Sequence, residues 1–435
     1  MKKIITNNAL LLLMLAMAFN FAAYAGNNKK GGSIAKVNTA AKASTSTTGK
    51  VGDSYRMYIN NINMPMNRSG VIAAVNIEDP IAEVSGAGGK FAGDVFLFSA
   101  GFFLSGYSNG NLFANAVASA SLVEDYVPGT VESGQSDPRA QLYVVKASDE
   151  PFSQSWIVWK DAVALGAGFY DGNNDGQYDP VDLNDNGEWD ADEDRPDLIC
   201  DETAWCVYND GLNQSSRRWT TEAPKGIEVR QTVFAFASKG SIGNIMFVRY
   251  RFKYVGRGQA DEPDVLKDCY FGVWSDTDLG DPDDDLIGSD PSRNVGYTYN
   301  DGPDNHAVYG NRPPAFFIDF FSGPISYIAG ETYVDNDGDN EYTDGIDTPL
   351  DTAFSVQGQV KGLKTYPGAK NLGISSFIQY INGDAKLDDP DNVIKARNYM
   401  LGLDADGAAV DPCNFAYGEV KSGDCKTTNN RLWYS

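Results

Sequence analysis

Histidine is the residue that this sequence has least of, because the chain of 435 residues contains only His306. One imidazole cannot build a zinc site of several histidines, and it leaves at most one general base for a catalytic triad. Basic side chains are also few: 35 lysines and arginines stand against 59 aspartates and glutamates, a formal net charge of −24. Nucleic-acid binding needs a basic surface, so this composition argues against nucleic acid as a partner.

Cysteine is sparse, and no C-x-x-C motif occurs, which argues against a thiolate metal site. In an oxidising compartment the closest pairs in the sequence, Cys200–Cys206 and Cys413–Cys425, are the candidates for disulfides, and Cys269 is left over. The sequence also lacks H-E-x-x-H, Walker A and dinucleotide-binding motifs. Zinc proteases, nucleotide-binding proteins and dinucleotide-dependent enzymes are therefore set aside.

Long hydrophobic runs are missing except at the N-terminus. Residues 1–3 carry positive charge, residues 10–23 are apolar, and residues 23–25 form a small-x-small cleavage site. This pattern predicts a secretory signal peptide over residues 1–25, cleaved near Ala25, in preference to a membrane anchor. No other run approaches the ~18 apolar residues of a spanning helix. We therefore expect no transmembrane helix in the mature chain and an extracellular or outer-cell-surface location.

The mature chain consists of short apolar runs separated by polar loops. Residues 26–50 lack apolar periodicity and are rich in Gly, Ser, Thr, Ala and Lys, which predicts a flexible linker. Helical spacing of apolar residues predicts helices within Phe152–Ala167 and Asn392–Leu403. The runs with the length and flanking residues of strands are Gly70–Ile77, Phe91–Ser105, Leu112–Val123, Leu142–Lys146, Ile227–Ala237, Asn244–Tyr254, Val265–Trp274, Ala315–Phe321 and Leu372–Ile381.

These elements predict a mainly β, β-sandwich-like fold with long Asp-rich loop insertions and one or two short helices. By composition, the mature chain divides after the linker into three regions. They are an N-terminal β-rich region (51–170), an acidic calcium-loop segment (171–225) and a β-sandwich-like region with further acidic loops (226–435).

The clearest alternation lies in the run Asn244–Tyr254. Its apolar and aromatic residues alternate with Arg249, Arg251 and Lys253, which puts the cations on one face of a strand. The cationic face is either an anion-binding stripe or, as is more usual, a solvated face paired with nearby carboxylates.

Thirteen acidic residues fall within Asp171–Glu202, where Arg195 is the single base. Two overlapping twelve-residue loops, 171–182 and 182–193, match the D-x-[DN]-x-[DN]-G pattern of calcium-binding loops, with glycine at position six. Calcium takes six to eight hard oxygen ligands, and this spacing curls alternate side chains around one point. The predicted ligands are Asp171, Asn173, Asp175, Gln177 through its backbone carbonyl, Asp179, Asp182, Asn184, Asn186, Glu188, Asp190 and Glu193.

Asp182 ends the first of these loops and begins the second, so it is predicted to serve both, and no helix fits between them. The arrangement resembles the tandem acidic loops of thrombospondin type 3 repeats more closely than a helix–loop–helix calcium sensor. Tyr178 and Trp189 stand at position eight of each loop, where an apolar side chain docks the loop on the core. We therefore expect structural calcium without a switch. The alternative is a solvated acidic loop without metal.

Two further acidic segments repeat the theme less regularly. Segment 335–344 has Asp at positions one, three and five, and Asn340 stands at position six, where Asn tolerates left-handed geometry. Its predicted ligands are Asp335, Asp337, Asp339 and Glu341. Segment 276–290 contains seven acidic residues and no base but fits no loop template. Its best candidate ligands are Asp276, Asp278 and Asp281, and for both segments a solvated loop is the alternative.

Several stretches resemble uncharacterised secreted proteins of Bacteroidetes-type bacteria that are usually exported by the type IX secretion route. The stretches that carry the resemblance are Gly106–Asp125, Asp171–Asp210, Gly226–Ala237 and Asp276–Asn300. The resemblance implies a large exported protein, surface-attached or released, with calcium-type loops. Such proteins usually end in a C-terminal β-sandwich sorting domain, and nothing after Lys421 resembles one. This leaves open a fragment of a longer product or another route of export.

We therefore expect a secreted or cell-surface, non-enzymatic protein of structure or adhesion, with calcium as cofactor and an unidentified protein or polysaccharide at the cell surface as partner. The alternative is a carbohydrate-binding module or glycoside hydrolase with structural calcium. For that alternative, Trp156, Trp159, Trp205 and Trp274 are either stacking platforms or core residues. A serine hydrolase is a third hypothesis, because G-x-S-x-G occurs at Gly106–Gly110, although a turn is the more ordinary interpretation.

Overall fold

The computed structural model describes residues 49–410, except 81–83, 118–124, 261, 264, 291–292, 301, 306–307 and 382. The predicted signal peptide, His306, Cys413 and Cys425 therefore lie outside the described residues, as does the linker up to residue 48. The described part is mainly β with two short α-helices, which confirms the predicted fold class. Neither helix has the length and hydrophobicity needed to cross a bilayer.

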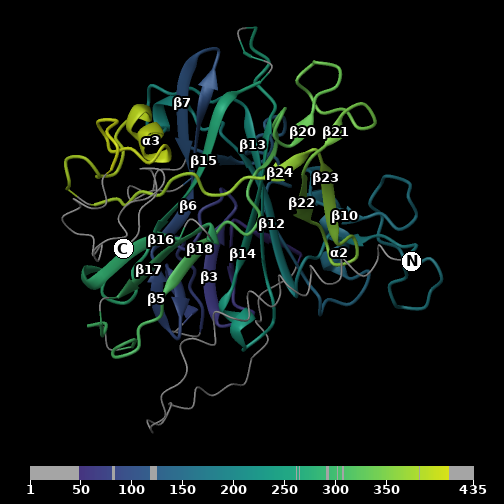
Figure 1. Cartoon of the computed structure of the whole chain (residues 1–435). Coiled ribbons are helices and arrows are strands. Elements are labelled where there is room, and N and C mark those ends of the chain that lie inside the picture. The colour runs from purple at the N-terminus through teal and green to yellow at the C-terminus, as the bar shows by residue number, and fades with distance from the viewer. Residues whose placement is uncertain are drawn as a thin grey trace.

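One layer of the molecule is a six-stranded antiparallel sheet, called here the main sheet (Figure 1). Its spatial order is β1 (Gly49–Gly52), β9 (Leu142–Lys146), β12 (Glu202–Asn209), β13 (Ile227–Ala235) and β14 (Phe247–Tyr254), and β8 (Val127–Pro128) pairs with β12. Because β12 lies between β9 and β13, the sheet draws strands from all three regions of the mature chain.

The second layer consists of two smaller antiparallel sheets. One has the order β15 (Lys267–Asp276), β6 (Ser99–Ser108) and β7 (Asn111–Ala116). The other has the order β2 (Ser54–Met57), β3 (Ile62–Asn67), β4 (Gly89–Phe91) and β5 (Asp94–Leu97).

The G-x-S-x-G match is the tip of the β6–β7 hairpin. Ser108 pairs with Asn111 across a two-residue turn, and both turn residues, Asn109 and Gly110, have positive φ. Asn-Gly is the sequence that such hairpin turns prefer. A strand follows the serine where a nucleophile elbow needs a helix, so the interpretation as a turn is confirmed.

The two layers pack face to face over the main hydrophobic core. Phe102 of β6 is fully buried, and its ring contacts Tyr208 of β12 and both Tyr250 and Phe252 of β14. The predicted alternation of β14 therefore sends its aromatic residues into the sandwich and its cations to the outer face of the main sheet.

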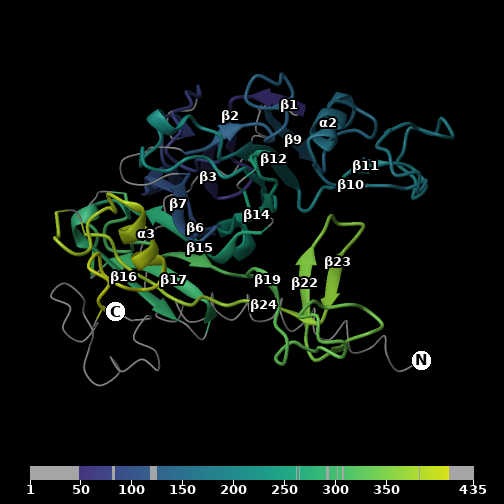
Figure 2. The ribbon, with the colours of Figure 1, turned by 90° about the horizontal axis from the view of Figure 1, so that it is seen from above.

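Helix α2 (Gln154–Ala164) covers one half of this outer face, over β1 and β9. Trp159 of the helix packs against Tyr143 and Trp205 of the sheet. Trp156, Trp159, Trp205 and Trp274 are all at most 9% exposed, so they are core residues rather than stacking platforms. Helix α3 (Val393–Met400) packs on β6 and β7, and Figure 2 shows the two helices on opposite sides of the molecule.

Small antiparallel units surround the two layers. They are β10 (Phe169–Tyr170) with β11 (Arg195–Pro196); β16 (Asp285–Asp290) with β17 (Val295–Asn300) and β18 (Phe316–Asp319); β19 (Ile325–Tyr327) with β24 (Ala369–Asn371); β20 (Tyr333–Val334) with β21 (Thr348–Pro349); and β22 (Thr352–Val356) with β23 (Leu363–Pro367). The β10–β11 and β20–β21 units matter most here, because each forms the base of an acidic loop segment.

Three local predictions are wrong. Leu372–Ile381 is not a strand, because its first amide bonds to the carbonyl of Pro324 and no ladder continues beyond β24. Gly70–Ile77 forms only isolated bridges. The Cys200–Cys206 disulfide is absent: both thiols are free and buried, and they belong to different hydrophobic clusters.

Candidate metal centres

The acidic loops of the chain stand on two-stranded bases. The first loop (171–182) and the second loop (182–193) lie between β10 and β11, and the third loop (335–346) lies between β20 and β21. Figure 1 shows both loop regions on the side of the molecule that carries α2 and the β22–β23 hairpin. In each case a short ladder brings the ends of the loop segment together.

The carboxylate at position one of each loop accepts backbone N–H bonds from across the turn. The donors are Asp175 (3.1 Å) and Gly176 (2.9 Å) for Asp171, Asn186 (3.2 Å) and Gly187 (2.7 Å) for Asp182, and Gly338 (2.6 Å) and Asn340 (2.9 Å) for Asp335. The amide bonds from Gly187 and Asn340 are the main reason that the pKa values of Asp182 and Asp335 lie below their usual range. Both groups are therefore ionised near neutral pH, as metal ligands must be.

The three loops also share one backbone conformation, with positive φ at positions four and six. The residues are Asn174 (60°) and Gly176 (77°), Asp185 (58°) and Gly187 (78°), and Gly338 (78°) and Asn340 (62°). Asn340 thus adopts the left-handed conformation expected of it. The missing glycine at position six therefore leaves the turn of the third loop unchanged.

One buried carboxylate closes each loop by accepting the backbone N–H groups of positions two and nine. We call these residues the closing carboxylates: Asp194 for the first loop, Glu193 for the second and Asp347 for the third. Asp194 accepts from Gly172 (3.0 Å) and Asp179 (2.8 Å). Glu193 accepts from Leu183 (2.6 Å) and Asp190 (2.8 Å), and Asp347 accepts from Asn336 (2.8 Å) and Thr343 (2.7 Å). The three closing residues are 2%, 2% and 6% exposed.

Sequence reasoning missed two of these closing carboxylates, Asp194 and Asp347. It expected Asp182 to close the first loop, but the side-chain bonds of Asp182 go to amides of the second loop, and Asp194 takes the closing position instead. Asp347 groups with Asp335 and Asp337, one ligand oxygen of each lying within 4.8 Å of the other two, which is close enough to share a metal ion. No spacing signal marks either residue, because the closing position differs from loop to loop.

The remaining predicted ligands lie on the open sides of the loops. The side chain of Asp190 accepts bonds from the amides of Asn184 and Asn186 at 2.8 and 2.9 Å. Asp175 accepts from Asn173 at 3.2 Å. Asp179 pairs with Lys160 outside the loop. Most of the predicted ligands are exposed: Asn173, Asp175, Gln177, Asp179, Asn184, Asn186, Glu188, Asp337, Asp339 and Glu341.

The residue at position eight docks the first loop on the core as expected, whereas in the second loop Trp189 is half-buried and packs on Tyr170 and Arg195 at the base of the loops. Tyr178 is 3% exposed, and its hydroxyl donates to the backbone carbonyl of Trp156 at 2.9 Å. Trp189 donates from its indole to the carbonyl of Glu193 at 2.9 Å, and its ring lies 4.8 Å from the guanidinium of Arg195. The single base of the acidic segment therefore holds the second loop through a cation–π contact.

The fourth acidic segment is organised differently. Asp276 ends β15, and Asp281 caps a 3-10 turn. Burial raises the pKa of Asp276 to about 6, with further contributions from Asp278 and Asp389, and burial also raises the pKa of Asp278. Burial raises the pKa of the neighbouring Asp285 to about 7. Among the described residues, these carboxylates form no group of three ligand atoms as close as that of the third loop.

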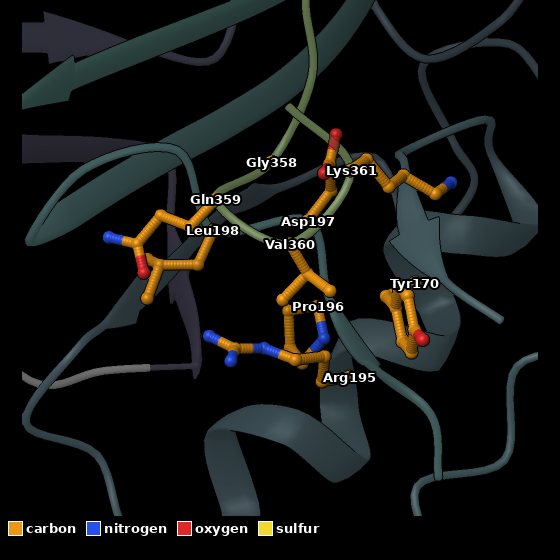
Figure 3. A pocket seen from close by; sticks show the side chains of 9 residues that line it. All are labelled: Tyr170, Arg195, Pro196, Asp197, Leu198, Gly358, Gln359, Val360 and Lys361. Atoms are coloured by element: carbon orange, nitrogen blue, oxygen red, sulfur yellow. The ribbon is translucent and has the colours of Figure 1, made fainter. Parts of the chain in front are cut away.

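A hairpin connects the two loop regions. The tip of β22–β23, residues 357–362, lies on the segment 195–198 at the base of the first two loops (Figure 3). The backbone N–H of Gln359 donates to the carbonyl of Leu198 at 2.8 Å. Gly358 approaches the side chain of Asp197 so closely that a Cβ would lie 2.0 Å from Oδ1. Since β22 follows β21 directly, this hairpin ties the third loop to the base of the other two.

Comparison of the chain with protein-family models, with curated proteins and with solved structures gives no significant match.

Proposed function

We propose that this protein is a secreted or cell-surface protein of structure or adhesion, without enzymatic activity, and that calcium bound in its Asp-rich loops stabilises it. The observation that carries the proposal is the shared architecture of three loops. Each loop has an ionisable residue at position one, left-handed residues at positions four and six, and a closing carboxylate on the amides of positions two and nine.

The chemistry of these side chains suits a hard divalent cation. Carboxylate and amide oxygens dominate all three loops, and calcium prefers such oxygens in flexible geometry. Thirteen acidic residues in one segment repel each other at short range, so a bound cation would offset this repulsion and draw the loop together. Metal that binds only the folded loop would add about 1.4 kcal/mol of stability per site at tenfold excess over Kd.

The test is a calcium titration of the full chain by calorimetry, with parallel thermal melts in calcium and in chelator. We expect two or three sites with Kd values of about 0.1–1 mM, the range of extracellular modules, and a melting temperature that falls in chelator. Magnesium is the matched control ion, because it is smaller and demands stricter octahedral geometry. Coincident melts with no heat of binding would mean that the loops are solvated without metal.

The carbohydrate-active alternative loses its main argument from the sequence. The four tryptophans proposed as platforms lie in the core, where they cannot stack on a polymer chain. Hydrolysis of a polysaccharide that is lost on substitution of a single carboxylate would still favour that alternative.

A further inference from the structure

Four cations gather on the outer face of the main sheet, on β13 and β14, where Arg251 and Lys253 are exposed and Arg230 and Arg249 are half-buried. We call them the cationic stripe: Arg230, Arg249, Arg251 and Lys253. Arg230 of β13 lies directly opposite Arg251 of β14 in the antiparallel register. Side chains opposite each other in such a pair share a face, with Cβ atoms about 5 Å apart.

The usual interpretation of such a stripe is ion pairing with nearby carboxylates, and the structure does not support it. None of the four cations forms a salt bridge within 4.0 Å to a described carboxylate. The cross-strand neighbour of Lys253 is Glu228, but this carboxylate is 4% exposed and accepts the amide of Val131. For Arg249, the carboxylate whose charge stabilises the guanidinium is that of Asp197, which is itself buried.

Two arginines of the stripe are held in place by their surroundings. The guanidinium of Arg230 lies against Gly166, where a Cβ would come within 2.3 Å of its Cζ. Arg249 donates to the carbonyl of Val356 in the β22–β23 hairpin at 2.9 Å. Arg251 and Lys253 are exposed beside them. Fixed guanidinium groups lose less conformational entropy when they bind a ligand.

Like charges directly opposite each other destabilise a strand pair, so the stripe carries a cost that an anionic ligand would relieve. Arginine forks bind the oxyanions of carboxylate, sulfate and phosphate in bidentate geometry. Arg249, Arg251 and Lys253 follow one another at about 7 Å along β14, the repeat of alternate strand residues. That spacing suits a polymer with separated charges better than a single small anion.

We propose that the cationic stripe binds the carboxylate or sulfate groups of an acidic polysaccharide. This inference does not depend on calcium binding, and it supplies a partner chemistry for a surface protein. Nucleic acid is the less favoured polyanion, because the charges along each strand of a duplex follow one another at about 3.4 Å, half the spacing of the cations along β14.

The experiment measures binding of the full chain to immobilised hyaluronan, dextran sulfate and uncharged dextran, in chelator, over a range of salt concentrations. We expect binding to one or both charged polymers, none to dextran, and an affinity that falls as salt rises. Binding to hyaluronan identifies carboxylates as sufficient, and binding to dextran sulfate alone identifies sulfates.

The test variants are Arg251→Gln and Lys253→Gln, because both side chains are exposed and their loss leaves the core intact. Each is expected to weaken binding about three- to tenfold, the loss of roughly one charge-assisted contact at an exposed site. Arg312→Gln is the matched control, since it removes one exposed arginine outside the stripe, and it should bind as the parent does.

Three results would overturn the inference. The first is an absence of binding to both charged polymers at low salt. The second is a loss in Arg312→Gln equal to that in Arg251→Gln, which would mean that only net charge matters. The third is equal or tighter binding of a single-stranded oligonucleotide, which would exclude the assignment to polysaccharide.

Discussion

Substitution of Asp194 by Asn tests the closing-carboxylate arrangement directly. Asp194 is 2% exposed, and its two oxygens accept the amides of Gly172 and Asp179 at 3.0 and 2.8 Å. Asn keeps one acceptor oxygen but turns an NH₂ group toward the second amide, which loses one bond and leaves a buried donor unpaired. Hydrogen bonds to charged groups contribute about 1.5–3 kcal/mol each, so we expect a loss of about 2–4 kcal/mol in chelator.

In calcium the same variant should lose more. If Asp194 supports one of three sites, the variant also loses that site's share of the calcium stabilisation, about 1.4 kcal/mol at tenfold excess over Kd. The assay is urea unfolding followed by tryptophan fluorescence, with and without chelator, on Asp194→Asn and on Glu193→Gln for the second loop. Each variant should remove one calcium site from the calorimetric stoichiometry and leave the others.

Asp185→Asn is the matched control for both variants. It removes one charge from the second loop at an exposed position with φ 58°, and Asn174 already has this conformation at the same position of the first loop. The control should unfold as the parent does. A loss in Asp194→Asn no greater than in Asp185→Asn would refute the reasoning about buried amides. An unchanged calcium increment would refute the link between Asp194 and metal.

Three further predictions concern the surroundings of the loops. Gly358→Val should destabilise the chain by about 1–3 kcal/mol in urea unfolding, because its Cβ would lie 2.0 Å from Asp197 Oδ1; an unchanged midpoint would mean that the hairpin tip shifts freely. Burial raises the pKa of Asp285 to about 7 in the folded chain, against 3.8 in the unfolded chain, so its ionisation costs stability as pH rises from about 4 to 7. Asp285→Asn should therefore stabilise the chain by about 1–3 kcal/mol at pH 7.5 and leave it unchanged at pH 4, whereas an equal effect at both pH values would contradict this burial argument. Cys200 and Cys206 should both take up an alkylating reagent in denaturant without reductant, which mass spectrometry detects; protection of the pair would indicate the disulfide that the structure lacks.

Local patterns in the sequence correctly predicted the fold class and several of its strands and helices. Alternation along β14 correctly separated an aromatic face from a cationic face, because side chains on a strand alternate by geometry alone. Helical spacing located α2, and the turn predicted at Gly106–Gly110 is the tip of the β6–β7 hairpin. The strand predicted at Leu372–Ile381 failed, because an apolar extended run becomes a strand only where a neighbouring chain supplies ladder partners.

The sequence by itself located the three acidic loops, since the spacing of their acidic residues and the residue at position six predict the turn that each loop makes. It did not identify Asp194 and Asp347, because a closing carboxylate is chosen by which side chain the two-stranded base buries beneath the loop. Nor did it reveal that the β22–β23 hairpin reaches from the third loop to the base of the others, a contact made between segments about 160 residues apart. Whether the cations of β14 meet carboxylates or solvent was likewise decided by the neighbouring strand, which places Arg230 opposite Arg251. Contacts over such distances arise only when the whole chain packs, because the pattern within any one segment carries no information about the partner it will meet.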